Sequence, residues 1–514
     1  MNADVVVVGA GNAALSAAVA ARDAGAEVLV LEKAPADLRG GNTRFTGGLF
    51  RIALRDVADV RRIVPALSDE EAATIHMEPY DADAFAHDIM RLSSGWSDPV
   101  LVRALVDASF ETICWLRDLG VEFRLYPKWI ERDGKRHWPD HAMISTVDGG
   151  QGLSASLFEA ARARGVEVLY GAGAHGLHYD ADGRVAGVRY TRNGQDLVAE
   201  APAVVLGSGG FEANPEMRAR YLGAPWDLAR VRGTRFNTGE MLTGALSAGA
   251  QSAGHWSAAH AVPIDAFAPD VGDLAIGALG SRTSYMFGIM VNRNGLRFVD
   301  EGSSFKLFTY AQTGKEILAQ PGGIAYQIFD QQVLDLVYSL TPGYTRPIDV
   351  GADRSGSGRA ASLSAPLKGN PVTADTIGDL ADRLGINRTA LAETVAAYNA
   401  SVGTAPFDPT VLDGRSTKGV TPPKSNWALA LERPPYVAYA VTCGITFTYG
   451  GLKVDETARV LDRSGQPVPS LYATGEIAGG FFYHNYPAGA GLMRGAVFGR
   501  IAGELAARSL AASR

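Results

Sequence analysis

The sequence is poor in cysteine and has no long apolar run. Its 514 residues include only two cysteines, Cys114 and Cys443, which stand far apart in the chain. Two thiols need no oxidising compartment, and their separation excludes a metal site built on closely spaced cysteines. No stretch of about 18 apolar residues occurs, which excludes a membrane-spanning helix. A strand is expected almost at the first residue, which leaves no room for a signal peptide. These absences favour a protein of the reducing cytoplasm.

Basic residues are fewer than a nucleic-acid-binding protein would carry. Lys and Arg number 48 against 55 Asp and Glu, which gives a net charge of −7 and a pI near 5.8. This balance disfavours nucleic acid and anionic membranes as partners. No metal site is expected, because no second ligand pair stands at helical spacing from the cluster of His137, Asp140 and His141. With 46% hydrophobic and 20% charged residues, the chain is expected to form two or three globular domains.

The strongest motif is at the start of the chain, in "DVVVVGAGNAALSAAVAARDAGAEVLVLEK". Four valines predict a buried strand, and a G-x-G-x-x-A turn (Gly9, Gly11, Ala14) follows them directly. An alanine-rich helix comes next, and a second strand ends at Glu32. The spacing of Glu32 from the glycines suits a carboxylate that binds the adenosine ribose, while the helix points its positive end at a pyrophosphate. The segment predicts a dinucleotide-binding βαβ unit.

Two further glycine-rich loops favour FAD over NAD. "RGGNTRFTGGLFR" (39–51) follows the second strand, and "PSLYATGEIAGG" (469–480) carries Glu476 late in the chain. FAD is the longer molecule and needs a second, C-terminal cofactor segment. The residues expected to hold FAD are Gly9, Gly11, Asn12, Ala13, Ala14, Glu32, Lys33, Gly41, Asn42, Thr43, Thr46, Gly47, Gly48, Gly209, Gly210, Glu476, Gly489, Gly491 and Leu492.

Over nearly its whole length the chain resembles the fumarate reductase and succinate dehydrogenase flavoproteins. The matching motifs are "GAGNAALSAA", "GGNTRFTGG", "VVLGSGGFEAN", "MVNRNGLRFVDE", "GGLKVD", "LYATGEIAGG" and "AVFGRIAG". Within that superfamily, "GGNTR", "FVDEGSSFKLFTYA", "GITFTYGGLKVD" and "FYHNYPAGAGL" look like the FAD-dependent tricarballylate dehydrogenases. The resemblance implies an α/β fold: a Rossmann-like FAD-binding domain (1–255 and 436–514) with an inserted α+β capping domain (256–435).

The resemblance also implies that FAD is held without a covalent bond. Succinate dehydrogenases attach the flavin through a His in the early glycine loop, and the matching position here is Asn42. No His occurs between Asn2 and His76.

Three charged residues of the superfamily's active sites are replaced in this sequence. Phe305 stands where fumarate reductases carry their proton-donating Arg, and Phe447 where they carry a substrate-binding His. Tyr486 matches their second substrate-binding Arg, so a simple fumarate reductase or succinate dehydrogenase is not expected. Tyr486 precedes a Pro-fixed turn at the final glycine loop, and we expect it to donate a hydrogen bond to a substrate oxygen.

Two residues of one segment are candidates for the general base. Lys306 would need a pKa lowered by burial, and Tyr310 follows it by one helical turn. The further candidates for substrate binding are Arg282, His260 and His484.

The sequence therefore predicts an FAD-dependent dehydrogenase that forms a C=C bond next to a carboxylate or ketone, as tricarballylate dehydrogenases do. Hydride would pass to flavin N5 and a proton to a base of the capping domain. The chain has no Fe–S cysteine set or haem site, so electrons would leave to a separate acceptor, such as a quinone, a ferredoxin-like protein or a membrane oxidoreductase.

Other functions stay open at this point. Alkene reduction would use the same site in reverse, and hydroxylation is a further possibility. A 3-ketosteroid-type Δ-dehydrogenase is favoured by Tyr486-Pro487, and a substrate pocket without Arg282 or Lys306 would support it. A flavin-binding protein without catalysis is the alternative outside the enzymes.

Overall fold

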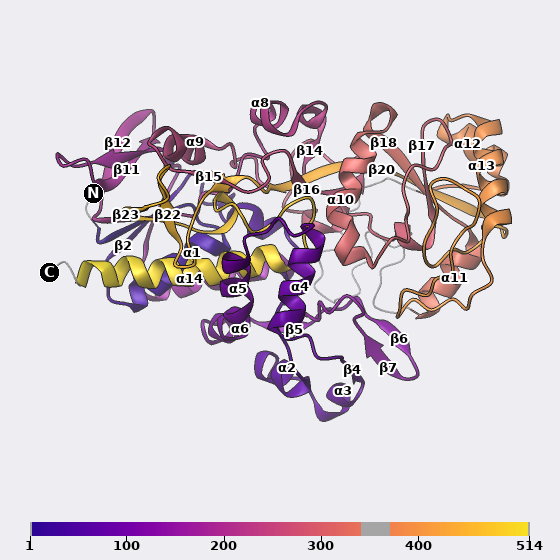
Figure 1. Cartoon of the computed structure of the whole chain (residues 1–514), viewed down its shortest axis with the longest axis horizontal. Coiled ribbons are helices and arrows are strands. Elements are labelled where there is room, and N and C mark those ends of the chain that lie inside the picture. Colours follow the sequence, from indigo (N-terminus) through magenta and orange to yellow (C-terminus); the bar gives the residue numbers. More distant parts are fainter. Residues whose placement is uncertain (1–2, 341–370, 512–514) are drawn as a thin grey trace.

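The computed structural model describes residues 3–340 and 371–511 (Figure 1). The predicted βαβ unit is confirmed as β1 (Val5–Val8), α1 (Asn12–Asp23) and β2 (Val28–Glu32). Every residue of β1 is buried, because the strand pairs in parallel with β2 on one side and β13 (Ala203–Leu206) on the other. This burial explains why the strand consists of valines only.

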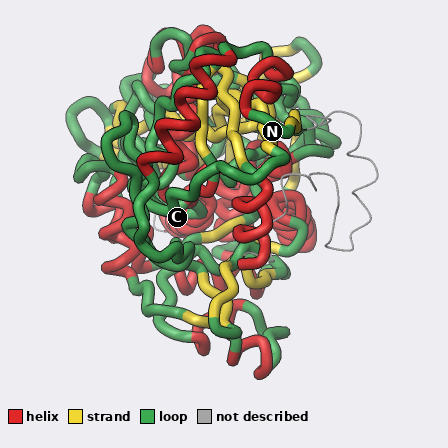
Figure 2. The backbone as a smooth tube through the Cα atoms, turned by 90° about the vertical axis from the view of Figure 1, so that its right-hand side faces the viewer, coloured by secondary structure: helices red, strands yellow, loops and turns green. Residues whose placement is uncertain are grey.

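The central sheet joins segments from both halves of the chain. Its order is β22-β23-β13-β1-β2-β9, with β9 at Glu167–Tyr170, β22 at Arg459–Leu461 and β23 at Pro467–Ala473. All of its pairings are parallel except the one between β22 and β23. In the molecule as a whole, helices pack around the strands (Figure 2). The carboxyl ends of β1 and β2, where the glycine loop and Glu32 follow, form one edge of this sheet.

The last helix packs along the first one. α14 (Ala490–Ala511) runs beside α1 in Figure 1, and a stripe of glycines faces α1. A Cβ atom at Gly499 or Gly503 would collide with the carbonyl oxygens of Ala13 and Ala17. The stripe therefore lets the two helices approach more closely than larger residues would allow. As a result, the start of α14 lies beside the first glycine loop.

The remaining elements of this part surround the central sheet. The helices are α2 (Val57–Ile63), α3 (Asp69–Ala73), α4 (Ala82–Leu92), α5 (Pro99–Asp107), α6 (Ser109–Asp118), α7 (Gly149–Ala163), α8 (Pro215–Met217) and α9 (Glu240–Ser247). The small sheets consist of β3 (Leu49–Phe50), β5 (Phe123–Leu125) and β8 (Ile144–Thr146); β4 (Ile75–His76), β6 (Ile130–Arg132) and β7 (Lys135–His137); β10 (Gly173–Tyr179), β11 (Val185–Arg192) and β12 (Gln195–Glu200); and β15 (Ser252–Ala253) with β21 (Gly451–Leu452).

A second sheet forms around one long strand. β20 (Tyr436–Thr448) pairs through its first half with β18 (Ile324–Phe329) and β19 (Val372–Ala374). Its second half pairs with β14 (Arg230–Val231) and β16 (Ala259–Asp265). The other elements are β17 (Ile289–Asn292), α10 (Lys306–Leu318), α11 (Gln331–Leu340), α12 (Ile377–Leu384) and α13 (Arg388–Ser401). These elements contribute most of a separate hydrophobic core. β20 thus connects this core to the FAD-binding part, and the limits of the capping domain at 256 and 435 stay a prediction.

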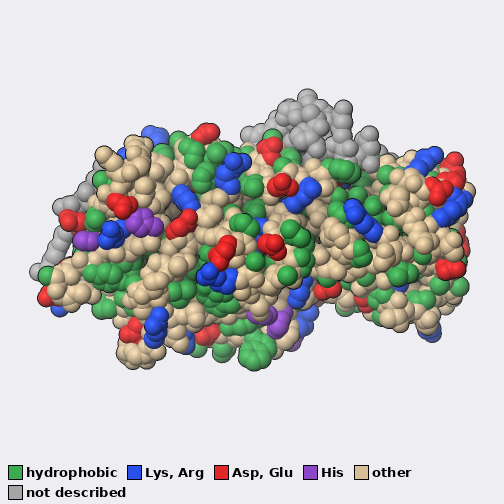
Figure 3. Space-filling model, turned by 90° about the horizontal axis from the view of Figure 1, so that it is seen from above, with side chains coloured by type: hydrophobic (Ala, Val, Ile, Leu, Met, Phe, Trp, Pro, Cys, Tyr) green, Lys and Arg blue, Asp and Glu red, His purple; other side chains and the backbone are tan. Residues whose placement is uncertain are grey.

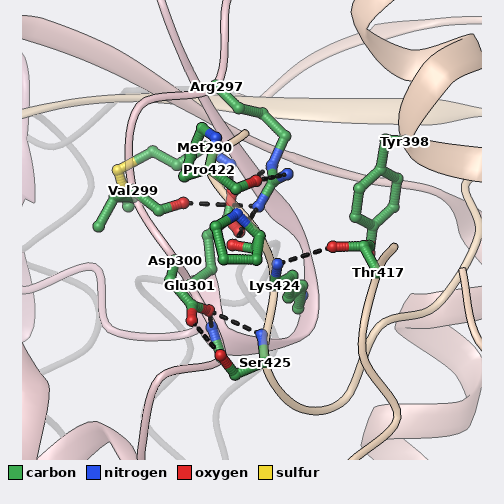
Figure 4. A network of polar contacts seen from close by, with 12 residues as sticks. Met290, Arg297, Val299, Asp300, Glu301, Tyr398, Thr417, Pro422, Lys424 and Ser425 are labelled. Carbon is green, nitrogen blue, oxygen red and sulfur yellow. Dashed lines mark hydrogen bonds and ion pairs between the residues drawn. The ribbon is translucent and has the colours of Figure 1, made fainter. Parts of the chain in front are cut away.

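The motif "RFVDE" forms a buried polar network inside this second core (Figure 4). Arg297 pairs with Glu301 at 2.6 Å, and the side chains are 4% and 0% exposed. Arg297 also donates to the carbonyl oxygen of Pro422, and Glu301 accepts from the backbone N–H of Met290. The neighbouring Asp300 accepts from the backbone N–H of Ser425. The motif therefore connects β17 to the loop that contains residues 422–425.

We expect Glu301→Gln to destabilise this second core by about 3–5 kcal/mol, because Arg297 would remain buried without its charged partner. Hydrogen exchange of residues 289–329 would measure the effect locally. Glu159→Gln is the matched control, because it removes one charge of an exposed ion pair with Arg162. Equal exchange in both variants would contradict the prediction.

Acidic and basic side chains are interspersed on the face shown in Figure 3. In the described ranges, no helix has the length and apolar character needed to cross a membrane. The same residues contain no group of three or more His, Cys, Asp or Glu placed to bind a metal ion. Both cysteines are buried as free thiols.

Candidate active site

A single cleft runs from the edge of the central sheet to the second sheet. It has an empty volume of about 1490 Å³, including open solvent. One end is lined by the residues that follow β1 and β2, and the other by side chains from α10, β16, β20 and the loop before α14. Of the residues expected to hold FAD, the lining contains Gly9, Gly11, Asn12, Ala13, Glu32, Lys33, Gly41, Asn42, Thr43, Thr46, Gly47, Gly209, Glu476, Gly489, Gly491 and Leu492, while Ala14, Gly48 and Gly210 are not part of it.

The end of the cleft near β1 is formed by backbone in a conformation that requires glycine. Gly9 has φ +95°, and a Cβ atom there would lie 2.5 Å from the carbonyl oxygen of Gly207. The loop 41–45 packs beside it, because the backbone N–H of Asn12 donates to Thr43 Oγ1 at 2.9 Å. At the end of β2, Glu32 is buried and accepts from the backbone N–H of Ala34. Burial raises the pKa of Glu32, and the backbone N–H groups of Ala34 and Ala10 oppose this shift.

These features fit FAD on physical grounds. The N-terminus of α1 opens onto the cleft, and its N–H groups and positive dipole suit a pyrophosphate. The start of α14 lies next to it, where Asn12 Nδ2 donates to the carbonyl oxygen of Leu492 at 2.8 Å. Asn12 Oδ1 is buried and has no hydrogen-bond partner among the described residues, so it is available to a ligand. The cleft thus offers polar groups along its length, with glycine backbone close to the space between them.

Asn42 is held in the middle of the cleft by three hydrogen bonds. Its Nδ2 donates to Glu212 Oε1 at 2.6 Å and to the carbonyl oxygen of Thr446 at 2.8 Å. Its Oδ1 accepts from the backbone N–H of Thr234. Asn42, which matches the flavin-attaching His of succinate dehydrogenases, therefore connects three segments of the chain. Non-covalent binding of the flavin stays a prediction.

A pair of buried carboxyl groups lies beside Asn42. Glu476 lines the cleft, and Glu212 sits against it. Asn237 Nδ2 donates to Glu212 at 2.7 Å, and the backbone N–H of Thr448 donates to Glu476 at 2.7 Å. Burial raises the pKa of both carboxyls, and the charge of Glu476 raises that of Glu212 well above its usual range. Ionisation of one of these adjacent carboxyl groups thus disfavours ionisation of the other.

At the other end of the cleft two tyrosines meet. Tyr310 comes from α10 and Tyr486 from the loop before α14, and their hydroxyl oxygens are 2.8 Å apart. Burial raises both pKa values, well above 10 for Tyr310, so both hydroxyls are protonated at neutral pH. His260 and Phe447 stack at 5.0 Å beside the pair. Burial lowers the pKa of His260 well below 6.5, which keeps its imidazole neutral. The site therefore offers two hydroxyl groups framed by aromatic rings.

Three of the predicted catalytic residues are not part of the cleft lining. Lys306 is buried close to Asp140, which opposes the lowering of its pKa by burial. Arg282 is paired with Asp265 at 2.6 Å, and both side chains are buried. His484 donates its backbone N–H to His255 Nδ1 at 3.0 Å. The structure thus brings Tyr486, Tyr310 and His260 together and leaves Lys306, Arg282 and His484 outside.

The lining also contains residues that the sequence analysis did not select. Arg232 follows β14 and faces the tyrosine pair. Burial lowers the pKa of Arg232, and the two phenol groups oppose that shift. Arg494 lies in the first turn of α14, over the rings of Phe447, Phe481 and Phe482. Burial lowers the pKa of Arg494 to about 10, and the nearby Glu476 opposes that shift. The sequence signal for Arg494 is a charged residue within the glycine-rich, apolar start of α14.

Comparison with known proteins agrees with this geometry. The model of the family described as FAD binding domain matches residues 4–492. A fumarate reductase (cytochrome) of Shewanella frigidimarina is 28% identical over 526 residues, which cover 98% of this chain and 77% of that protein. A 3-oxosteroid 1-dehydrogenase of Mycolicibacterium smegmatis is 27% identical over 590 residues and covers 99% and 98% of the two chains.

The fold comparison gives the same result. The open conformation of a flavocytochrome c3 fumarate reductase superposes with a TM-score of 0.70 at 26% identity. The match covers 99% of this chain and 78% of that one. The predicted fold class and the FAD cofactor are confirmed. The chain belongs to the FAD-binding family of the fumarate reductase and succinate dehydrogenase flavoproteins, which are oxidoreductases that act on carbon–carbon bonds.

Proposed function

We propose that this protein is a dehydrogenase that forms a C=C bond next to a carboxylate or a ketone, in the manner of a tricarballylate dehydrogenase. The observation that carries the proposal is the hydroxyl pair of Tyr310 and Tyr486 in the cleft whose other end fits FAD. Such a reaction removes a hydride from one carbon and a proton from its neighbour, while the substrate oxygen gains negative charge. Bound FAD supplies the acceptor for the hydride.

The two hydroxyl groups have different roles in the rest of the reaction. Tyr486 donates a hydrogen bond to the substrate oxygen, and Tyr310 exchanges the proton of the neighbouring carbon. The 2.8 Å contact lets a proton pass between them. Arg232 faces both phenols and stabilises negative charge on either one. Phe447 and His260 form an uncharged wall that keeps water from the reacting carbons. Electrons leave to a separate acceptor.

A second candidate is a 3-ketosteroid-type Δ-dehydrogenase. The absence of Arg282 and Lys306 from the cleft lining favours it, as do the rings around Tyr486. Arg232 favours a carboxylate substrate, because it places a cation at the end of the cleft where Tyr310 and Tyr486 lie. Alkene reduction by the same residues is the reverse reaction.

Anaerobic reduction of the purified flavoprotein by a panel of polycarboxylates, steroids and cyclic ketones tests the proposal. Bleaching of the visible flavin band by a carboxylate supports an acid dehydrogenase. Bleaching by a steroid or cyclic ketone alone favours the second candidate. A protein whose flavin is reduced by no member, and whose reduced form reduces no matching alkene, would overturn both.

The rate of dehydrogenation is expected to keep rising with pH through pH 10. The form of Tyr310 that accepts a proton is the phenolate, and burial together with Tyr486 raises its pKa well above 10. The phenolate fraction therefore grows about tenfold per pH unit below that pKa. Rapid-mixing measurements of flavin reduction from pH 6 upward would show the slope, and Tyr310→Phe should remove it. A wild-type plateau near neutral pH would point to another base.

A further inference from the structure

We propose that Arg232 binds a carboxylate group of the substrate and makes the cleft selective for acids. This inference rests on the proposed function and assigns its substrate class. Arg232 directly follows β14 and contributes to the lining of the cleft beside Tyr310 and Tyr486. It is the cation of the lining that lies near both tyrosines, while Arg494 lies near Tyr486 only.

The other two cations of the lining each lie near a carboxyl group. Lys33 pairs with Glu240 at 2.7 Å at the opposite end of the cleft. Arg494 forms no ion pair with the described residues, but it lies near Glu476, is buried and is covered by three phenyl rings. Arg232, in contrast, is partly exposed and has no carboxylate of residues 3–340 or 371–511 near it. A mostly buried guanidinium in this position is left with a desolvation cost that an anionic ligand would offset.

The hydrogen bonds of Arg232 fix its orientation and leave donors free. Its Nε donates to Ser281 Oγ at 2.9 Å, and its Nη1 lies 3.5 Å from Thr446 Oγ1. These hydroxyls occupy two of the five N–H donors of a guanidinium, and the others can bind a carboxylate through two parallel hydrogen bonds. Ser281 and Thr446 belong to different segments, so the side chain is held from two directions before a ligand arrives.

The described groups that face Arg232 include no carboxylate. The groups that face it are the hydroxyls of Tyr310 and Tyr486, the neutral ring of His260 and the amine of Lys128. Burial and the charge of Arg232 lower the pKa of Lys128. An acid bound there would have its carboxylate at Arg232 and its reacting carbons between the tyrosine hydroxyls and FAD. A neutral ketone would leave the guanidinium unpaired.

The test is a binding titration of the FAD-loaded protein, followed by the change in the flavin spectrum under conditions without turnover. The probes are tricarballylate, succinate and the neutral triamide of tricarballylate. Arg232→Met is expected to raise the dissociation constants of the two acids about 30-fold or more and to change that of the triamide only slightly. Arg232→Lys should be intermediate, because it retains the charge and loses the paired donors.

Arg235→Met is the matched control, since it removes an exposed positive charge three residues away. It should leave all dissociation constants unchanged. The FAD content and melting temperature of each variant show whether it is folded. The proposal is overturned if the wild type binds neither acid, or if Arg232→Met weakens acids and triamide equally.

The two proposals fail in different ways. If a ketone reduces the flavin and the wild type binds neither acid, Arg232 is not a carboxylate anchor, and oxidation of a carbon–carbon bond still stands. If no compound reduces the flavin but the acids bind through Arg232, the proposed reaction fails and the acid site stands.

Discussion

Replacing Tyr486 with Phe is expected to lower the rate of flavin reduction by about 10²–10⁴-fold while FAD stays bound. The substitution removes the hydroxyl that lies 2.8 Å from Tyr310 and faces the substrate end of the cleft. The ring itself stays packed between His260, Phe447 and Phe482, so the cleft keeps its shape. Rapid anaerobic mixing with the substrate found in the panel measures the rate, and the flavin spectrum measures FAD content.

Tyr449→Phe is the control for this experiment. Tyr449 is buried beside Phe447 but is not part of the cleft lining. Its hydroxyl has no hydrogen-bond partner among the described residues, so its removal should change the rate little. A similar loss in both variants would mean that any buried hydroxyl near Phe447 supports the packing, and Tyr486 would lose its chemical role.

Replacing Gly9 with Ala is expected to abolish FAD binding. Gly9 has φ +95°, and the added Cβ would lie 2.5 Å from the carbonyl oxygen of Gly207. Strain and overlap together cost about 2–5 kcal/mol, and β1 or β13 must shift to relieve them. Both strands end at the cleft, so the shift displaces the N–H groups that we expect to bind the pyrophosphate. Absorbance of the purified protein and titration of the apoprotein with FAD measure the loss.

Gly25→Ala is the control that tests backbone strain alone, without a steric collision of the added Cβ atom. Gly25 has φ +94°, almost the value at Gly9, but a Cβ atom there meets nothing within 4 Å. The variant should lose about 1–2 kcal/mol of stability and still bind FAD. If it also lost the cofactor, the effect at Gly9 would reflect general destabilisation.

The cofactor end of the cleft could be predicted from the sequence because its signals are local. A strand of valines, the glycines of the turn and Glu32 lie within one short segment, and each follows from the chemistry of its own position. The same holds for the loop 39–51 and for Glu476. The motif "GSGGFEAN" does not reveal the position of Glu212 in the site, because that position depends on contact with Glu476 far along the chain.

The substrate end could not be predicted in the same way. Tyr310 and Tyr486 are brought together by the packing of α10 against the loop before α14, which no local pattern encodes. Lys306 and Tyr310 lie one helical turn apart, yet Lys306 lies near Asp140 and outside the lining. Arg282 is likewise paired with Asp265, which the sequence could not reveal.

The glycine stripe of α14 has a consequence for biosynthesis. α1 packs against a helix that is translated nearly five hundred residues later. Until residues 490–511 have emerged, the nascent chain lacks the part of the cleft that Gly491, Leu492, Arg494 and Gly495 line, and α1 exposes the face that α14 will cover. We therefore expect FAD to be loaded late, and chaperones that shield apolar helices have a long opportunity to bind α1.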